Sequence, residues 1–405
     1  MKSLAGPFLA VLYLLSVAFY YLDASGTLKY FQYALPAIGL GISLINVRRV
    51  WFAAGDLARL SRTIGILCFL NLLILLVNGD LYTKYFQESF LLAGALFFAV
   101  MVAGNLTHHT GSILTWALYS LVGIFMIDKG SALLRVLLNP GEIVAGLLTS
   151  SIQTESSLSF YFALLSLYFI FEKDKPKAVI AILFMILSFK RVAFVGFLAA
   201  IFIQFVFTSL KINYNRRLYS ISLTVFNFAY LWILLLLING QFDEVISSTL
   251  GVSSNFLFMG RVDLYNTVLA KTGYINWFGM GVGSISTILN RLVESGNSEG
   301  TLVNLHSDIL KYYLEFGIFL FPIFLYKFIH YLARNSAAFC MMVMLNIILL
   351  TDNVSIYFGF MVLFYLIIYK IGYFPHQNIA DSKHTTDKKK NRHFPQQKNP
   401  HLEPV

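Results

Sequence analysis

Long apolar runs separated by short polar loops make up most of the chain. A helix needs about 20 mostly apolar residues to cross a bilayer, and twelve runs meet or approach that length. They lie at residues 5–22, 28–46, 62–78, 89–105, 111–128, 156–172, 177–189, 192–210, 218–239, 309–328, 337–351 and 354–372. This pattern predicts an all-α polytopic membrane protein with about 12 transmembrane helices.

One apolar block carries a basic interruption. Residues 177–210 are apolar apart from Lys190 and Arg191 in the middle. A single helix of that length would measure about 50 Å at 1.5 Å per residue, which exceeds the roughly 30 Å hydrocarbon core. We therefore predict two helices that meet at Lys190-Arg191 on a membrane surface.

The longest polar stretch begins after Asn239 and occupies residues 240–308. Long loops of this kind are usually functional or disordered. Apolar residues recur in it at regular spacing, which favours a folded segment: Phe256, Leu264, Val268, Ile288 and Leu292. We predict a large extracytoplasmic loop that caps the bundle and carries the chemistry.

The composition and the charges support a membrane location. The chain is 58% hydrophobic and 12% charged, against about 25% charged residues in soluble domains. The net charge of +10 comes from short loops and the tail, so membrane topology explains it better than nucleic-acid binding. With both termini in the cytoplasm, most lysines and arginines fall on the cytoplasmic side, and the large loop and Lys190-Arg191 share the outer surface.

Two other segments complete the predicted organisation. Residues 129–155 are apolar but contain charges and Pro140, which favours an amphipathic segment lying on the outer face of the bundle. The polar tail is predicted to be disordered and cytoplasmic. The predicted divisions are 1–128, 129–155, 156–239, 240–308, 309–372 and 373–405.

Basic residues on the outer surface are candidates for binding phosphate. Lys190 and Arg191 interrupt an apolar block, and Arg261 lies in the loop over the same face. The planar guanidinium suits phosphate oxygens, so these residues are candidates for holding a diphosphate at the membrane surface. Arg291 is a further candidate in the same loop. The alternative is that the arginines reach toward lipid headgroups without binding a substrate.

His306 is the candidate for proton transfer. It precedes the apolar run that resumes at residue 309, and its usual pKa near 6.5 suits proton exchange at working pH. A structural hydrogen bond is the alternative for a lone histidine. Asp308 and Glu315 are seven residues apart, which places them on one face of a helix. Glu315 has the alternative role of a carboxylate stabilised by the start of a helix.

Two further patterns narrow the chemistry. Gly279, Gly281 and Gly283 resemble part of a dinucleotide-binding motif, but no βαβ unit surrounds them. We interpret them as tight turns in the cap. No Asp-x-Asp occurs in the chain, which disfavours a metal-dependent glycosyltransferase that uses nucleotide sugars. We therefore predict neither a metal site nor a cofactor.

The order of these motifs is similar to that of a known family. The basic break FKRVAF is followed by GRVDLY, FGMGVGS, LHSDILKYYLEFGI and TDN. This series resembles the bacterial O-antigen polymerase and O-antigen ligase superfamily over roughly residues 180–360. The matching positions are Lys190-Arg191, Gly260-Arg261, Gly281, Gly283, His306, Leu310, Glu315 and Gly317. The sequence departs from the family pattern at Ser307-Asp308, at Tyr265 in place of tryptophan, and at residues 154–156.

The resemblance implies a polysaccharide polymerase of the bacterial inner membrane. It would join repeat units carried on undecaprenyl diphosphate by inverting glycosyl transfer at the outer face. The resemblance also implies that His306 is the catalytic base, and that Lys190, Arg191, Arg261 and Glu315 bind substrate. Arg291 and Asp308 are predicted as further substrate-binding residues from their place in the same segment. The implied partners are the lipid-linked oligosaccharide, membrane lipids, a chain-length regulator and a flippase. The alternatives are an O-antigen ligase that transfers the glycan to the lipid A core, and a flippase for lipid-linked oligosaccharides.

Overall fold

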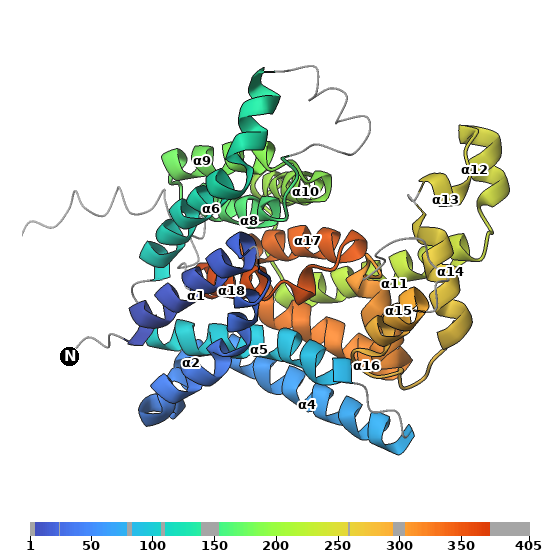
Figure 1. Ribbon diagram of the computed structural model, residues 1–405, viewed down its shortest axis with the longest axis horizontal. Helices are drawn as coiled ribbons and strands as arrows, with labels where there is room; N and C mark the ends of the chain where they lie inside the picture. The colour runs from blue at the N-terminus through green and yellow to red at the C-terminus, as the bar shows by residue number, and fades with distance from the viewer. Residues whose placement is uncertain are drawn as a thin grey trace, which may run out of the picture. The chain divides into compact units, whose positions relative to one another are not determined.

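The computed structural model of the protein describes residues 5–23, 25–78, 83–106, 110–138, 154–257, 260–294 and 304–372. All regular secondary structure in these ranges is helical (Figure 1), which confirms the predicted all-α class. By length and composition, eight of these helical segments qualify as membrane spans, and three apolar helices of 14 to 16 residues accompany them. The chain is therefore that of a multipass membrane protein.

The first half of the chain forms most of its predicted spans as continuous helices. Its elements are α1 (Ala5–Leu22), η1 (Leu28–Tyr33), α2 (Leu35–Ser43), η2 (Leu44–Asn46), α3 (Val47–Ala54), α4 (Asp56–Asn78), α5 (Thr83–Leu106) and α6 (Thr110–Leu138). The predicted helix 28–46 is instead a series of three short helices. Pro36 in the first turn of α2 explains one break, because proline has no backbone N–H to continue a helix.

Helix α6 also differs from the prediction. It continues to Leu138, ten residues beyond the predicted end at 128, so the first part of the predicted outer segment belongs to a helix. The sequence ALLRVLL at 132–138 consists mainly of good helix formers, and Pro140 follows. Residues 139–153 of the predicted outer segment, and the tail 373–405, lie outside the described residues.

The second half of the chain contains the cap and the remaining helices. They are α8 (Leu158–Phe171), α9 (Lys175–Leu187), α10 (Arg191–Ser209), α11 (Arg216–Ile238), α12 (Asp243–Leu250), α13 (Ser254–Leu257), α14 (Arg261–Thr272), α15 (Ser284–Glu294), α16 (Asp308–Leu332), α17 (Ser336–Thr351), η3 (Val354–Ile356) and α18 (Phe358–Ile371). As predicted, the block 177–210 forms two helices, which meet at Phe189-Lys190.

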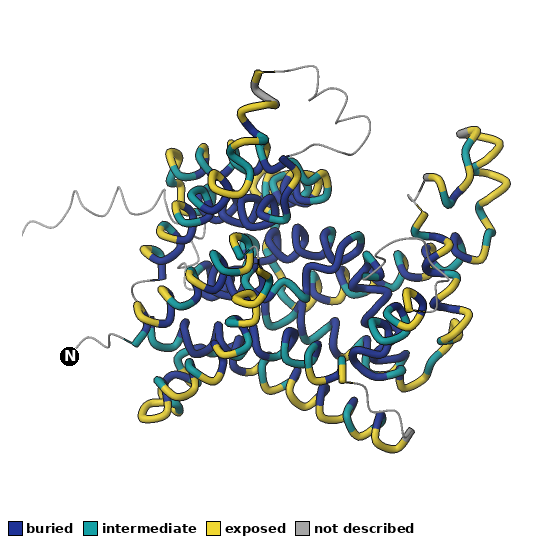
Figure 2. The backbone as a smooth tube through the Cα atoms, viewed as in Figure 1, coloured by how far each residue is buried: buried dark blue, intermediate teal, exposed yellow. Residues whose placement is uncertain are grey.

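The most deeply buried helices are α8, α17 and α18 (Figure 2). Helix α18 packs against α5 and α8, while α17 packs against α10 and α16. Close packing replaces the hydrophobic effect as the main attraction between helices in a bilayer. Small residues permit it: a Cβ atom on Gly104 of α5 would lie 2.4 Å from the Val50 carbonyl oxygen of α3.

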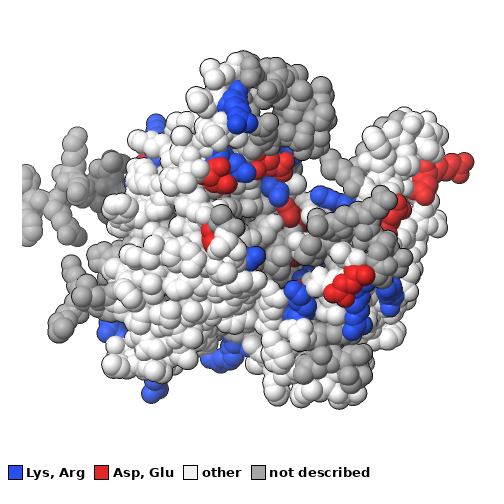
Figure 3. Space-filling view, viewed as in Figure 1, with Lys and Arg blue, Asp and Glu red and all other residues white. Residues whose placement is uncertain are grey.

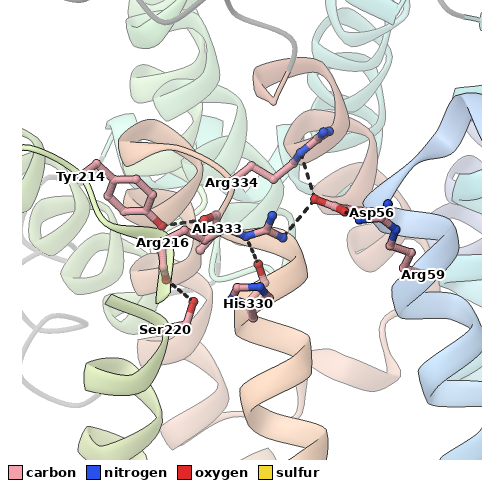
Figure 4. Close-up of polar contacts among 8 residues, drawn as sticks. All are labelled: Asp56, Arg59, Tyr214, Arg216, Ser220, His330, Ala333 and Arg334. Atoms are coloured by element: carbon pink, nitrogen blue, oxygen red, sulfur yellow. Dashed lines mark hydrogen bonds and ion pairs between the residues drawn. The ribbon is translucent and has the colours of Figure 1, made fainter. Parts of the chain in front are cut away.

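A cluster of three arginines around one aspartate joins three helices (Figure 4). The Asp56 carboxylate, at the start of α4, lies 3.1 Å from Arg59 Nη1, 3.0 Å from Arg216 Nη2 and 3.2 Å from Arg334 Nε. Arg216 begins α11 and Arg334 follows the end of α16. Asp56 is buried, so the cluster compensates its charge and fixes these three helix ends together.

Arg216 of this cluster and the nearby Tyr214 bind carbonyl groups at the end of α16 that have no partner within the helix. Arg216 Nε donates a hydrogen bond to the His330 carbonyl at 2.6 Å, and the Tyr214 hydroxyl donates one to the Ala333 carbonyl at 2.6 Å. The last carbonyls of any helix have no partner within it. The opposite ends of α11 and α16 lie about 35 Å away at 1.5 Å per residue, and both lead into the cap.

We predict that the Asp56 end of the bundle is cytoplasmic and that the cap is extracytoplasmic. A reporter enzyme that is active only outside the cytoplasm is expected to work when it is fused after Gly251, in the cap. It is expected to fail after Asn213, in the basic loop before α11, because lysines and arginines are retained on the cytoplasmic side. Activity of the Asn213 fusion would overturn this orientation.

Candidate functional site

His306 lies in the turn that leads into α16. Its backbone φ is 54°, a left-handed conformation that residues other than glycine seldom adopt. Ser307 then caps the helix, since its hydroxyl accepts a hydrogen bond from the Leu310 backbone N–H at 3.3 Å. Such a backbone conformation costs on the order of 1–3 kcal/mol and persists only where the surrounding structure enforces it.

The buried carboxylate of Asp308 fixes the chain just after His306. Its two oxygens accept hydrogen bonds from the Ser355 hydroxyl at 2.7 Å and the Ser355 backbone N–H at 2.8 Å. The Asp308 backbone N–H donates to the Asp352 carbonyl at 3.3 Å. The sequence predicted that Asp308 binds substrate, but its side chain has no exposed surface. In the structure it fixes the start of α16 to the turn between α17 and α18.

Lys190 and Asp352 form an ion pair between two other helix ends. Lys190 precedes α10 and Asp352 follows α17, and Lys190 Nζ lies 2.8 Å from Asp352 Oδ2. The ammonium group also lies 4.9 Å from the ring centre of Phe160, at a distance typical of cation–π contacts. The lysine remains partly exposed while the aspartate is buried, so the positive charge is the more accessible of the two.

Helix α14 of the cap brings Arg261 to the same place. Arg261 is the first residue of α14, and its Nη1 donates a hydrogen bond to the Thr351 carbonyl at 3.1 Å. One turn further along, the Tyr265 hydroxyl donates to the His306 carbonyl at 3.4 Å. The cap therefore contacts both the end of α17 and the turn before α16. We refer to Lys190, Arg261, His306 and Asp352 as the cap-end site.

The electrostatics of the cap-end site favour a neutral imidazole. Burial lowers the pKa of His306 below its usual value of about 6.5, and the Arg261 guanidinium lowers it further. Asp352 raises the pKa of His306, and Lys190 lowers it. At neutral pH the ring therefore keeps one nitrogen free to accept a proton, next to two cations that attract anions.

Arg191, Arg291 and Glu315 occupy other positions. Arg191 is exposed in the first turn of α10, and its guanidinium has no hydrogen bond or ion pair with a described residue. Arg291 is exposed on α15, which packs against α5 and α16. Substrate binding by these two arginines stays a prediction. Glu315 is fully buried, nine residues along the chain from His306, and the structure gives it a different role.

Glu315 and the glycine run hold the cap in a break of α16. Helix α16 is interrupted at Gly317, where φ is 71° and ψ is 179°. The loop 276–283 fills the break with five hydrogen bonds. Two run from α16 to the loop: Ile318 N–H donates to the Asn276 carbonyl at 2.9 Å, and Phe319 N–H to the Trp277 carbonyl at 3.2 Å. Three run from the loop to α16: Met280 N–H donates to the Leu314 carbonyl at 3.0 Å, Gly281 N–H to the Glu315 carbonyl at 3.0 Å, and Gly283 N–H to Glu315 Oε1 at 2.9 Å. The loop thus satisfies the backbone groups that the break exposes.

The three glycines are required by space as well as by conformation. Gly279, Gly281 and Gly283 all have positive φ, between 80° and 91°. A Cβ atom on Gly279 would lie 2.1 Å from the Glu315 carbonyl oxygen. One turn before Glu315, the buried Lys311 forms an ion pair with Glu88 of α5 at 2.5 Å, so this part of α16 is fixed on two sides.

Sequence reasoning missed three residues in or next to the cap-end site. Asp352 was part of the TDN motif, but its pairing with Lys190 joins positions far apart in the chain. Tyr265 was noted only as a departure from the family pattern. Ser355 had no recognisable signal, since a serine between two apolar helices is common. Only the three-dimensional arrangement reveals that these side chains meet Lys190, His306 and Asp308 respectively.

The fold and the site together define a class of protein. This is a multipass α-helical membrane protein in which a helical cap covers one end of the bundle, and a histidine, two cations and a carboxylate meet beneath the cap. Its chemistry is suited to binding an anionic group and accepting a proton at that end.

Comparison with protein families supports the resemblance over part of the chain. Residues 177–325 match the family model Wzy_C, described as O-antigen ligase. The match confirms the resemblance to the O-antigen polymerase and ligase superfamily, whose members are glycosyltransferase-like enzymes. It includes Lys190, Arg261 and His306, while Asp352 lies beyond it. Comparisons with curated proteins and with solved structures gave no match.

The contact between Gly279 and Glu315 predicts a specific loss of stability. Gly279→Ala places a methyl group against the Glu315 carbonyl and should cost about 1–3 kcal/mol beyond the strain of a positive φ. Gly251→Ala is the matched control, because Gly251 has a φ of 69° but open space around it. Thermal unfolding of the two purified variants should separate them clearly. Equal losses would show that the close contact contributes nothing.

Proposed function

We propose that this protein is a polysaccharide polymerase that joins repeat units carried on undecaprenyl diphosphate at the outer face of the inner membrane. The reaction would be a metal-independent inverting glycosyl transfer. The observation that carries the proposal is the cap-end site, where a histidine with a lowered pKa lies beside Arg261 and Lys190. The superfamily match supports the reaction class.

The two cations suit a diphosphate leaving group. Arg261 uses one of its five N–H donors on the Thr351 carbonyl, which orients the guanidinium and leaves donors for phosphate oxygens. Lys190 is held by Asp352 in the same way. As the glycosidic bond to the diphosphate breaks, negative charge grows on the leaving oxygen. Cations fixed in advance stabilise that charge without further rearrangement.

His306 suits the role of general base. The hydroxyl oxygen of the acceptor sugar attacks the anomeric carbon of the donor, a new C–O bond forms, and the bond to the diphosphate breaks. The hydroxyl proton passes to the neutral imidazole. A base placed in this way typically contributes about 10²–10⁴-fold to the rate.

A ligase is the second candidate, and a specific observation favours it. The matching family carries the description O-antigen ligase. A ligase would use the same donor site but transfer the completed glycan to a lipid A core. The departures at Tyr265 and Ser307-Asp308 from the superfamily pattern favour the polymerase. The two candidates predict different products when the activity is lost.

A strain that lacks the gene is expected to accumulate single repeat units, because a polymerase is needed to extend them. The measurement is the length of the glycan on lipid carrier and on the cell surface, resolved by gel electrophoresis and mass spectrometry. Restoration by the wild-type gene but not by a gene encoding Arg261→Ala is the control. Full-length glycan stranded on the carrier would instead establish the ligase.

The kcat/KM of purified wild-type enzyme is expected to fall as pH drops below about 6.5. This parameter reports the free enzyme, in which His306 has a lowered pKa and must be neutral to accept a proton. Lys190→Gln removes a cation that lowers this pKa and releases Asp352, which raises it. The acid limb should therefore move to higher pH. Lys271 is an exposed lysine at the end of α14. The control variant Lys271→Gln should lose activity at the same acidic pH as the wild type.

His306→Gln tests the same assignment directly. The variant is expected to retain little activity, and its remaining rate should not fall at acidic pH as that of the wild type does. Near-normal turnover with an unchanged acid limb would remove His306 from the mechanism. A lower rate that still falls at the same acidic pH would mean that a group other than His306 causes the pH dependence.

A further inference from the structure

A cavity of about 550 Å³ lies in the cap, between the end of α11 and helices α12, α13 and α14. It is open to solvent: Ile238 and Val262 are the buried apolar residues of its lining, and its three carboxylates are exposed. Its walls are polar and carry hydroxyl, amide and carboxylate groups: Asp243, Glu244, Ser247, Ser253, Ser254, Asn255, Asp263 and Asn266. We call it the arm cavity. Its volume lies within the range of about 300–1,000 Å³ that is usual for small-ligand sites.

The polar groups of the arm cavity are held in place by one another. Ser254 Oγ donates a hydrogen bond to Asp243 Oδ1, and Asn255 Nδ2 donates one to Asp263 Oδ2. The Asp263 backbone N–H donates back to Asn255 Oδ1 at 3.3 Å. Each aspartate therefore has a fixed orientation, and its second carboxylate oxygen accepts no hydrogen bond from the described residues. These oxygens are acceptors for the hydroxyl or amino groups of a ligand.

The charge of the arm cavity is opposite to that of the chain. Three carboxylates and no lysine or arginine occur among the described residues that line it, although the whole chain has a net charge of +10. Acidic side chains are visible over this arm of the molecule, at the right of Figure 3. Phosphate, uronic acids and anionic lipid headgroups are repelled by such a lining. Neutral and positively charged polyols are favoured.

Helix α14 connects the arm cavity to the cap-end site. Arg261 belongs to the cap-end site and Tyr265 contacts it. Val262, Asp263 and Asn266 line the arm cavity. Adjacent helical residues are separated by about 1.5 Å along the axis, so the two sites lie on different faces of the same two turns. Phe256 of α13, next to Asn255, is 74% exposed, and its ring offers an apolar surface to the C–H groups of a sugar.

We propose that the arm cavity is a saccharide subsite that binds neutral or amino sugars of the repeat unit and rejects acidic ones. The proposal rests on the proposed function, because it assumes that a glycan attached to a diphosphate is handled at Arg261. The sugars beyond the reacting one then extend along α14 into the arm cavity. Specificity comes from its hydroxyl-binding carboxylates and from repulsion of negative charge.

The test measures saccharide binding to the full-length protein in nanodiscs by saturation-transfer NMR. The probes are a trisaccharide of N-acetylglucosamine, one of glucosamine and one of galacturonic acid, which are neutral, cationic and anionic. The wild type should bind the first two and bind the galacturonic acid trimer at least about tenfold more weakly. Asp243→Asn combined with Asp263→Asn should weaken the glucosamine trimer about tenfold, as expected for lost contacts to charged groups, and should reduce the discrimination against the acidic trimer.

Two controls separate this proposal from the proposed function. Glu294→Gln neutralises a carboxylate on α15, outside the arm cavity, and should bind all three probes as the wild type does. Undecaprenyl diphosphate should bind normally to the double aspartate variant and weakly to Arg261→Ala. Absence of saccharide binding, or unchanged binding and discrimination in the double variant, would overturn the subsite. Normal binding of undecaprenyl diphosphate by Arg261→Ala would instead overturn the donor site at Arg261.

Discussion

The structure depends on the break of α16 at Gly317 and on the loop that fills it. A break inside a membrane helix exposes backbone groups that no lipid can satisfy. Here the loop 276–283 supplies their partners, so the break and the loop require one another. The loop connects α14 to α15, and fixing it therefore fixes the cap on the bundle. The position of Arg261 above the end of α17 follows from this attachment, because Arg261 begins the helix that leads into the loop.

Charged side chains hold the two ends of the bundle in different ways. At one end three arginines surround Asp56, so the cluster carries a net positive charge and joins three helix ends. At the other end Lys190 and Asp352 balance each other, and Arg261 uses a carbonyl group as its partner. At the cap end, Arg261 and Lys190 keep donors available next to His306, which is what a binding site for an anion requires.

The sequence predicted the helical class, the meeting of two helices at Lys190-Arg191, and a histidine in the turn before α16. These features follow from local patterns, since span length and basic interruptions are visible along the chain. The roles of Asp308 and Glu315 were not visible in this way. Their spacing of seven residues correctly placed them on one face of a helix, but spacing does not tell whether that face meets solvent or the interior. Asp352 was missed for a related reason: its partner Lys190 is far away in sequence, and no periodicity links them.

On the proposed function, the same cations serve both binding and proton transfer. Arg261 and Lys190 keep His306 neutral in the free enzyme, so the base is ready but weak. A bound diphosphate offsets these cations. The negative charge of the diphosphate stabilises the imidazolium and so raises the pKa of His306 in the complex. The base therefore becomes stronger when the donor is present, and proton removal from the acceptor hydroxyl is favoured only in the complex that has a sugar to transfer.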